Sequence, residues 1–179
     1  MSTFDLAIPV ILAHEGGWVS NPADPGGETN YGISTLIIRR EGITAEKLGI
    51  DPATMFQPGY LKPMKVDAAK AIYKEYFWDK FGYGRLNDQT VATKVFDCSV
   101  NCGQRRAHVL AQRACPPLVT DGILGPASVA AINALDPKRF VTQMAEEMKK
   151  YYATIIVANP KLKVFEKNWM HRAQWGVQP

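Results

Sequence analysis

Glu15 is the residue whose neighbours in the sequence point most directly to chemistry. It is the last residue of an apolar amphipathic stretch, and Gly16, Gly17 and Trp18 follow it directly. A carboxylate at a helix end, against an indole and beside backbone without side chains, is poorly solvated, and poor solvation raises the pKa of a carboxylic acid. Such an acid can protonate the leaving oxygen of a glycosidic bond, and the glycines leave room for a sugar chain. The alternative interpretation is an ordinary helix C-terminus, where glycine is common and a glutamate is simply solvated.

A polar segment follows soon after this acid. Residues 21–33 read NPADPGGETNYGI, which cannot form a regular helix and is too long for a minimal turn, so we expect a shaped loop or a short irregular β-hairpin. An inverting glycosidase needs a second group across the bond, with room for a water molecule and side chains that orient it. The alternative is a loop whose polar side chains bond their own backbone. Four polar residues of the segment could supply this second group or orient the water: Asp24, nine positions after the acid, and then Glu28, Thr29 and Asn30.

Three motifs resemble the signature of glycoside hydrolase family 108. They are HEGGW (14–18), NPADPGG (21–27) and TNYGI (29–33). The likeness extends to AKAIYKEYFW (69–78) and FDCSVNCG (96–103), and DGILGP (121–126) resembles the predicted peptidoglycan-binding region of these proteins. Members are N-acetylmuramidases, found as phage endolysins and as bacterial muramidases that assist toxin or protein export. The resemblance covers nearly the whole chain and implies that the glutamate of the EGG motif, here Glu15, is the catalytic acid.

The resemblance identifies the second catalytic residue less directly than the first. The spacing of nine between Glu15 and Asp24 resembles that of phage T4-type lysozymes, which invert the anomeric centre with a Glu, an Asp and a Thr. Their Thr lies two residues before the Gly of a Gly-Ile pair, and here that position holds Asn30, with Thr29 one residue earlier. Either side chain could hold the attacking water. The predicted catalytic residues are Glu15, Asp24 and Thr29, and the predicted substrate contacts are Gly16, Gly17, Trp18, Asn30 and Tyr31.

The expected reaction is hydrolysis of the β-1,4 bond between N-acetylmuramic acid and N-acetylglucosamine in peptidoglycan, by a phage endolysin that lyses its host. A lytic transglycosylase is the alternative enzyme, since it uses one acid without an activated water and leaves a 1,6-anhydro end. Outside enzymes, the alternative is a cell-wall-binding module in which Glu15 is structural. Product mass separates the two enzymes, and a Glu15→Gln variant separates both from the module.

The rest of the chain predicts helices joined by turns, in a mainly α, lysozyme-like fold. Ser34 can cap a short helix that Gly42 ends, Asp67 can cap a helix over 68–81, and Asp88 opens the helix expected at the centre of the core. Further helices are predicted over 104–114, over 127–135, from Asp136 to Pro160, and around Trp169. We expect a catalytic region over 1–90 and a helical peptidoglycan-binding region over 91–179, packed as one compact body.

The charge of the chain favours an anionic partner. Its formal net charge is +4 at pH 7, and peptidoglycan carries peptides with free carboxylates. Nucleic acid is another polyanion, but the basic residues occur in scattered pairs such as Arg39-Arg40 and Arg105-Arg106, without the run that is typical of a DNA-binding arm. We interpret these pairs as solvated surface charge, and we expect a monomer that binds peptidoglycan and no nucleic acid.

The three cysteines favour reduced thiols. Cys98, Cys102 and Cys115 cannot all pair internally, which fits synthesis in the cytosol. The sequence contains no CxxC or HExxH motif, so we expect neither a metal nor a cofactor. A cysteine peptidase would need a thiolate paired with one of the three histidines, which the sequence leaves open, and buried core cysteines are the preferred interpretation.

The apolar segment near the N-terminus does not have the features of a targeting signal. Residues 6–13 follow Asp5, contain no Lys or Arg, end in HEGG, and are too few to span a bilayer. We therefore expect synthesis in the cytoplasm without a signal peptide, action in the periplasm, and no stable membrane insertion. A phage holin or an export system would then give the enzyme access to the wall.

Overall fold

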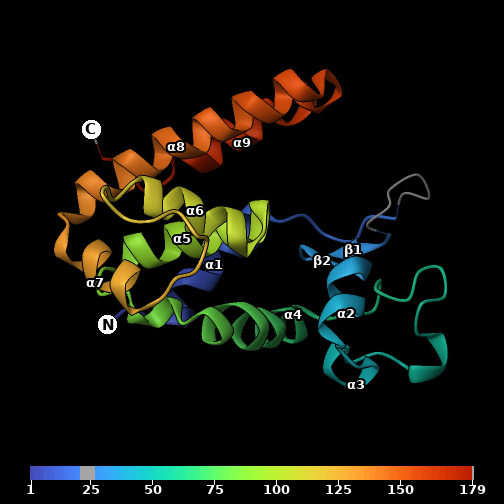
Figure 1. Ribbon diagram of the computed structural model, residues 1–179. Coiled ribbons are helices and arrows are strands. Elements are labelled where there is room, and N and C mark those ends of the chain that lie inside the picture. The colour runs from blue at the N-terminus through green and yellow to red at the C-terminus, as the bar shows by residue number, and fades with distance from the viewer. Residues whose placement is uncertain (21–26, 179) are drawn as a thin grey trace. The chain divides into compact units, whose positions relative to one another are not determined.

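The structure is a computed structural model that describes residues 1–20 and 27–178 (Figure 1). The chain forms two compact units: unit 1 comprises Met1–Ala7 and Gly82–Pro179, and unit 2 comprises Ile8–Phe81. Helices dominate both units, and the strands within the described ranges form one antiparallel pair, β1 (Thr29–Asn30) and β2 (Ile33–Ser34). The predicted mainly α fold with a small hairpin after the first helix is confirmed.

Unit 2 is built around the hairpin and short helices. Ser34 caps α2, because its Oγ accepts a hydrogen bond from the Ile37 backbone N–H at 3.3 Å, and Gly42 ends that helix with a φ of 65°. Both ends agree with the prediction. The regular elements are the second half of α1 (Phe4–His14), α2 (Thr35–Glu41), α3 (Ala45–Leu48), a 3-10 turn (Pro52–Thr54), α4 (Val66–Tyr73) and its π-helical continuation (Lys74–Asp79).

The start of α4 differs from the prediction. The sequence predicts Asp67 as the N-cap, but the helix begins at Val66, and Lys65 at the N-cap position makes no side-chain capping bond. Asp67 lies in the first turn, where its carboxylate accepts a hydrogen bond from Lys70 at 3.2 Å. A carboxylate stabilises a helix start from the cap or from the first turn, because both positions lie near the positive end of the helix dipole, so residue type alone does not fix the register.

Unit 1 is organised around α5 (Gln89–Cys102). Every residue from Val91 to Ser99 is buried, and the carboxylate of Asp88 caps the helix by accepting the Val91 N–H at 2.9 Å, as predicted. In Figure 1, α6 runs along α5, and α8 and α9 lie side by side; α8 also packs on α5 and α6. The remaining elements are a 3-10 turn (Tyr83–Arg85), α6 (Gln104–Arg113), α7 (Pro126–Ala134), α8 (Pro137–Ala158), a 3-10 helix (Pro160–Phe165) and α9 (Glu166–Gln174).

A buried lysine joins α5 to the end of α9. The ammonium of Lys94 donates to the carbonyl oxygens of Arg172 at 3.4 Å and Trp175 at 2.7 Å, and also to that of Ala173. The last carbonyls of a helix have no partner inside it, so this ammonium takes the place of a C-terminal cap. Burial lowers the pKa of Lys94 to about 8, against a smaller opposing effect of the nearby Asp97 carboxylate.

The first residues of the chain pack in unit 1. The Phe4 ring lies 6.2 Å from the ring of Phe96 on α5, measured between centroids. The Thr3 backbone N–H donates to Gln89 Oε1 at 2.8 Å, and Gln89 Nε2 donates back to the Thr3 carbonyl at 3.1 Å. These residues therefore complete a core made by a segment more than eighty positions later in the sequence.

The turn at 121–126 is held against α6 by two buried side chains. Gln112 accepts the Gly122 N–H at 2.9 Å and donates to Asp121 at 2.7 Å. His108 uses both ring nitrogens, with Nδ1 3.1 Å from the Gly122 carbonyl and Nε2 3.0 Å from the Tyr83 hydroxyl, and burial lowers its pKa. Gly122 has a φ of 79°, and a Cβ there would lie 2.7 Å from Cγ of Arg105, so the turn needs glycine to approach α6.

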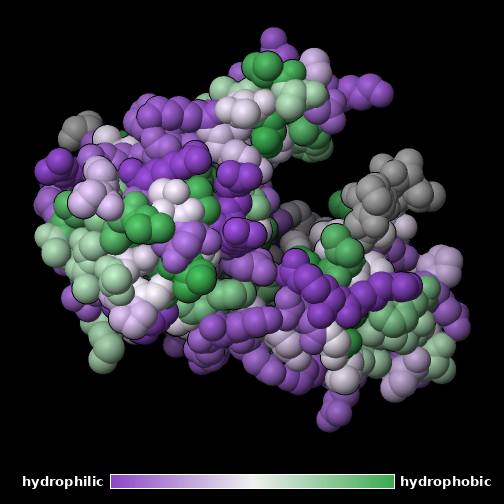
Figure 2. Space-filling view, in the orientation of Figure 1, coloured by the Kyte–Doolittle hydropathy of each residue, from purple (hydrophilic) through white to green (hydrophobic). Residues whose placement is uncertain are grey.

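The surface of unit 1 combines hydrophilic and apolar areas. Figure 2 shows hydrophilic side chains over α6, and apolar side chains at the end of α8 and in the segment after it, where Val157 is 82% exposed. Within residues 1–20 and 27–178, none of the helices combines the length and the apolar character needed to cross a membrane.

Candidate active site

Glu15 continues α1 by one residue. Its backbone N–H donates to the Ile11 carbonyl at 2.9 Å, in the i to i−4 pattern of the helix, while Ile11 itself is fully buried in the core. Glu15 is half-buried, whereas Gly16 and Gly17 are exposed. A Cβ added at either glycine would meet no atom within 4 Å, so the two glycines leave open space beside the acid.

The tip of the hairpin lies against the side chain of Glu15. Tyr31 and Gly32 form its two-residue loop with φ angles of 48° and 78°, the combination found in type I′ turns. A Cβ at Gly32 would lie 2.7 Å from both Cγ and Oε2 of Glu15, and it would also collide with the Tyr73 hydroxyl. That hydroxyl donates to the Tyr31 carbonyl at 2.9 Å. The hairpin tip therefore fits between the acid and α4 only because residue 32 has no side chain.

Asn30 and Thr29 point to opposite faces of the hairpin. Asn30 is buried, and its Nδ2 donates to the carbonyls of Leu61 at 2.8 Å and Met64 at 3.5 Å. Side chains alternate along a strand, so Thr29 lies on the other face. Thr29 is half-buried, and its hydroxyl makes no hydrogen bond to the described part of the chain. Of the two predicted water-holding groups, the amide nitrogen of Asn30 is thus already bonded within unit 2.

The backbone of Thr29 is fixed by a second pairing. Its N–H and carbonyl bond the carbonyl and N–H of Val19 at 2.9 and 2.8 Å, so the segment after Glu15 runs antiparallel to β1. This bridge brings the chain just beyond the acid next to the strand that carries the candidate threonine. Asp24, the predicted second catalytic residue, lies between Val19 and Thr29 in sequence and outside the residues that the structure describes.

Glu28 is a structural carboxylate. It is buried and accepts hydrogen bonds from the backbone N–H of Leu61 at 3.3 Å, from that of Gly59, and from the indole Nε1 of Trp18 at 3.3 Å. Trp18 is 38% exposed, with the Lys62 ammonium 5.3 Å from its ring centroid. The indole that the sequence placed against Glu15 is therefore oriented by Glu28, and its ring still presents surface to solvent.

Sequence reasoning missed two contributors to this site. In the sequence, Gly32 stands out only as part of the TNYGI motif, and Tyr73 only as one residue of a predicted helix. Neither role has a signal in composition or periodicity, because each depends on a contact between segments far apart in the sequence. Across residues 1–20 and 27–178, no cluster of three or more His, Cys, Asp and Glu side chains is placed to hold a metal ion.

Comparison with known proteins identifies the family. The family model described as glycosyl hydrolase 108 matches residues 8–103, which include the acid, the glycine pair and the whole hairpin. The chain belongs to this family. A second family model, described as a predicted peptidoglycan domain, matches residues 100–174. The resemblance drawn from the sequence motifs is confirmed.

A solved structure resembles this chain over both regions that the family models match. The structure of SagA from Brucella abortus superimposes with a TM-score of 0.72 at 25% sequence identity, covering 96% of this chain and 89% of that chain. No curated protein sequence matches the chain. The two family matches make this glycosyl hydrolase 108 member a peptidoglycan hydrolase of the muramidase type, and peptidoglycan is its partner.

Proposed function

We propose that Glu15 is the general acid with which this muramidase cleaves the β-1,4 bond between N-acetylmuramic acid and N-acetylglucosamine. The proton of Glu15 passes to the glycosidic oxygen as the bond from that oxygen to C1 breaks. A water molecule then bonds to C1 and gives up a proton, for which we assign Asp24 as the base from its position nine residues after Glu15.

One observation carries this proposal: the carboxylate of Glu15 lies against Gly32 at the hairpin tip, next to the open space at Gly16 and Gly17. Contact with the hairpin tip restricts the orientations of the Glu15 carboxylate. An acid held in one orientation protonates a bound substrate more effectively than a mobile one. The exposed glycines allow a sugar chain to reach it. The partly exposed ring of Trp18 is suited to stacking on a sugar face.

We assign the positioning of water to Thr29 rather than to Asn30. The hydroxyl of Thr29 has no hydrogen-bond partner among the described residues, whereas Asn30 Nδ2 donates to the carbonyls of Leu61 and Met64. Presenting Asn30 Nδ2 to a water would break the bonds that it makes in a buried site, which costs about 1–3 kcal/mol for each group left unsatisfied. Thr29 can bind a water at no such cost.

The test of the acid is Glu15→Gln, with Glu46→Gln as the matched control. Glu46 is an exposed glutamate of α3, so both variants lose one negative charge and gain one amide in unit 2. Loss of general acid catalysis should lower the rate of sacculus lysis by ~10²–10⁴-fold in Glu15→Gln only, with both unfolding midpoints close to that of the wild type. More than a tenth of wild-type lysis in Glu15→Gln would show that Glu15 is not the acid.

The test of water positioning compares Thr29→Val with Thr29→Ser. The first keeps the branched shape without the hydroxyl, and the second keeps the hydroxyl. Thr29→Val should depress turnover more than sacculus binding, and Thr29→Ser should retain most of the turnover. If both turn over like the wild type while Asn30→Ala is dead, the water is held at residue 30. Product mass completes the assignment, since a product one water lighter, with a 1,6-anhydro end, would mean a lytic transglycosylase.

We also propose that the protein is a monomeric phage endolysin, made in the cytoplasm and active in the periplasm after a holin or an export system gives it access to the wall. Support comes from the free thiols of Cys98, Cys102 and Cys115, which fit synthesis in a reducing compartment. Expression inside a Gram-negative host should be tolerated until the inner membrane is permeabilised, after which culture density should fall abruptly. Lysis without permeabilisation would contradict this route.

A further inference from the structure

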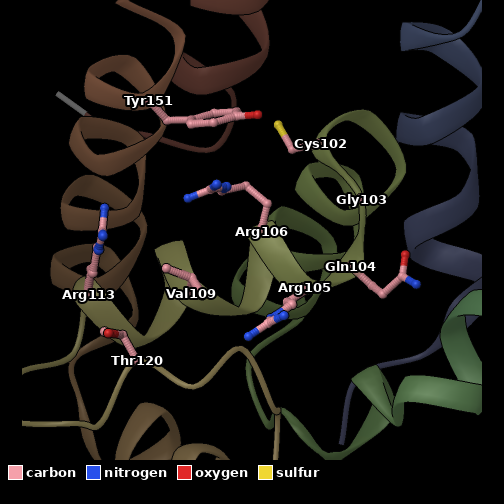
Figure 3. A pocket seen from close by; sticks show the side chains of 9 residues that line it. All are labelled: Cys102, Gly103, Gln104, Arg105, Arg106, Val109, Arg113, Thr120 and Tyr151. Atoms are coloured by element: carbon pink, nitrogen blue, oxygen red, sulfur yellow. The ribbon is translucent and has the colours of Figure 1, made fainter. Parts of the chain in front are cut away.

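A hollow of about 630 Å³ opens on the surface of unit 1, between α6, α8 and the segment that leads into the 121–126 turn (Figure 3). Three of its lining residues are arginines, and none is an aspartate or a glutamate. A concave site of this size can enclose a ligand of several residues or sugars. The lining consists of Cys102, Gly103, Gln104, Arg105, Arg106, Val109, Arg113, Thr120 and Tyr151.

The three guanidinium groups remain available to a ligand. In the part of the chain that the structure describes, none of Arg105, Arg106 and Arg113 forms an ion pair with a carboxylate. The Asp121 carboxylate interacts electrostatically with Arg105, but its hydrogen bonds come from the Gln112 side chain at 2.7 Å and from the backbone N–H of Ile123 at 2.8 Å. Three guanidinium groups against one nearby carboxylate leave a net positive charge, which raises the local concentration of anions at a concave surface.

Two of the arginines, Arg105 and Arg106, are held in position by their neighbours. Arg106 and Arg113 lie seven residues apart, two turns along the same face of α6, and Figure 3 shows both directed into the space beside Tyr151. The Arg106 guanidinium carbon lies 4.9 Å from the centroid of the Tyr151 ring. The stem of Arg105 is covered by Gly122, where a Cβ would not fit. This order reduces the conformational entropy that the side chains lose when a ligand binds.

The start of α6 lies at one end of the pocket. Gly103 occupies the N-cap position and provides no side chain to accept the first backbone N–H groups of the helix. Those groups carry part of the positive end of the helix dipole, and the first turn contains Arg105 and Arg106. Because α5 ends at Cys102, the negative end of its dipole lies at the same place and offsets that of α6, so the guanidinium groups supply the positive potential of the pocket.

We propose that this pocket binds the free carboxylates of the peptides that are attached to the glycan strands of peptidoglycan. Arginine forms two parallel hydrogen bonds to one carboxylate, and three arginines in one hollow suit a ligand with more than one carboxylate. The inference rests on the proposed function, because it takes the cell wall as the ligand. It assigns recognition of the wall peptide to unit 1, separately from the sugar chemistry assigned to Glu15.

The experiment measures binding of a soluble disaccharide–tetrapeptide by calorimetry, with Glu15→Gln protein so that the fragment is not cleaved. The pocket variant carries Arg105→Gln, Arg106→Gln and Arg113→Gln. The matched control carries Arg139→Gln, Lys163→Gln and Lys167→Gln, which removes the same charge from exposed residues of unit 1 outside the hollow. Affinity should fall about tenfold or more in the pocket variant and less than threefold in the control, since charge-assisted hydrogen bonds are lost only there.

Two further probes test the chemistry of the ligand. The same fragment with its carboxylates amidated should bind the unaltered pocket about tenfold more weakly, and the loss should be small in the pocket variant. Equal binding of the amidated fragment, or equal losses in both triple variants, would overturn the proposal. Displacement of the fragment by inorganic phosphate at lower concentration than by acetate would also overturn it, since phosphate would then be the preferred ligand. If the triple variant does not fold, Arg113→Gln alone, at an exposed position, gives the same comparison.

Failure of this inference can be distinguished from failure of the proposed function. If Glu15→Gln still lyses sacculi, the catalytic assignment is wrong, while the calorimetric comparison of the arginine variants stands. If Glu15→Gln is inactive and the pocket variant binds the fragment like the matched control, the peptide-binding assignment is wrong and the catalytic one stands.

Discussion

Replacing Gly32 by alanine tests whether the hairpin tip positions the catalytic acid. The new Cβ would start 2.7 Å from Cγ and Oε2 of Glu15, whereas ordinary contact begins at 3.4 Å, so the carboxylate must withdraw by about 0.7 Å or the hairpin must move. A misplacement of about 1 Å can lower an enzymatic rate ~10²-fold. We therefore expect lysis to fall between about tenfold and 10²-fold.

Alanine at residue 32 also destabilises the backbone, and a control variant separates this effect from the displacement of Glu15. Gly32 has a φ of 78°, a conformation that costs an alanine roughly 1–2 kcal/mol. Gly42 has a φ of 65° at the end of α2 in the same unit, and a Cβ there would meet no atom within 4 Å. Gly42→Ala should therefore show a similar backbone penalty in its unfolding midpoint without any displacement of Glu15.

The assay combines sacculus turbidity with thermal unfolding, both measured well below the unfolding midpoints of the two variants. Lysis by Gly32→Ala should be at least about tenfold slower than lysis by Gly42→Ala, with sacculus binding unchanged. Activity of Gly32→Ala within threefold of the Gly42→Ala control would refute the argument, because the acid would then tolerate displacement or would not be the acid.

Three other predictions concern buried polar groups. Glu28→Gln should lower stability by about 1.5–3 kcal/mol in thermal unfolding, because an amide cannot replace a carboxylate that accepts three hydrogen bonds. Lysis by the folded fraction should fall far less than in Glu15→Gln, because the acid is unchanged and only the bond that orients Trp18 is weakened. Lys94→Met should cost about 1–3 kcal/mol in urea unfolding by leaving the carbonyls at the end of α9 without a donor, and an unchanged midpoint would contradict this. Burial lowers the pKa of His108 below 6.5, so as the pH falls the unfolded chain binds a proton at this residue before the folded chain does. The neutral, buried His108 therefore contributes stability above pH 6.5, and this contribution is lost as the pH falls through the folded-state pKa. His108→Gln should make the unfolding free energy less dependent on pH in this range.

Features that depend on neighbouring residues could be predicted from the sequence. The caps Ser34 and Asp88 are side-chain oxygens that bond a backbone N–H three residues later, so a short window contains the whole interaction. The helix end at Glu15 and the hairpin after it follow in the same way from glycine content and turn residues. Asp67 shows the limit of such reasoning, because a carboxylate suits two adjacent registers of a helix start.

Features that depend on contacts between distant segments could not be predicted. Residue 32 must be glycine because α1 and α4 both approach the hairpin tip, and the sequence contains no measure of that approach. The sequence offers Asn30 as a residue that could hold a water, and only the structure shows that its amide nitrogen donates to the Leu61 carbonyl. Likewise, Arg105-Arg106 reads as ordinary surface charge in the sequence, because only the fold brings Arg113 and Tyr151 to the same hollow.

The division of the chain into units has a consequence for folding and for the exchange of modules in evolution. Unit 2 ends at Phe81, but Met1–Ala7 pack with residues such as Gln89, whose bond with Thr3 closes a loop of 86 positions. During synthesis, all of unit 2 therefore leaves the ribosome before the first turn of α1 has a partner, and unit 1 closes last, through contacts of large sequence separation that form slowly. A head-to-tail fusion of residues 1–81 to another wall-binding tail would leave the first turn of α1 without its core, so the catalytic segment cannot be transferred as an independent block.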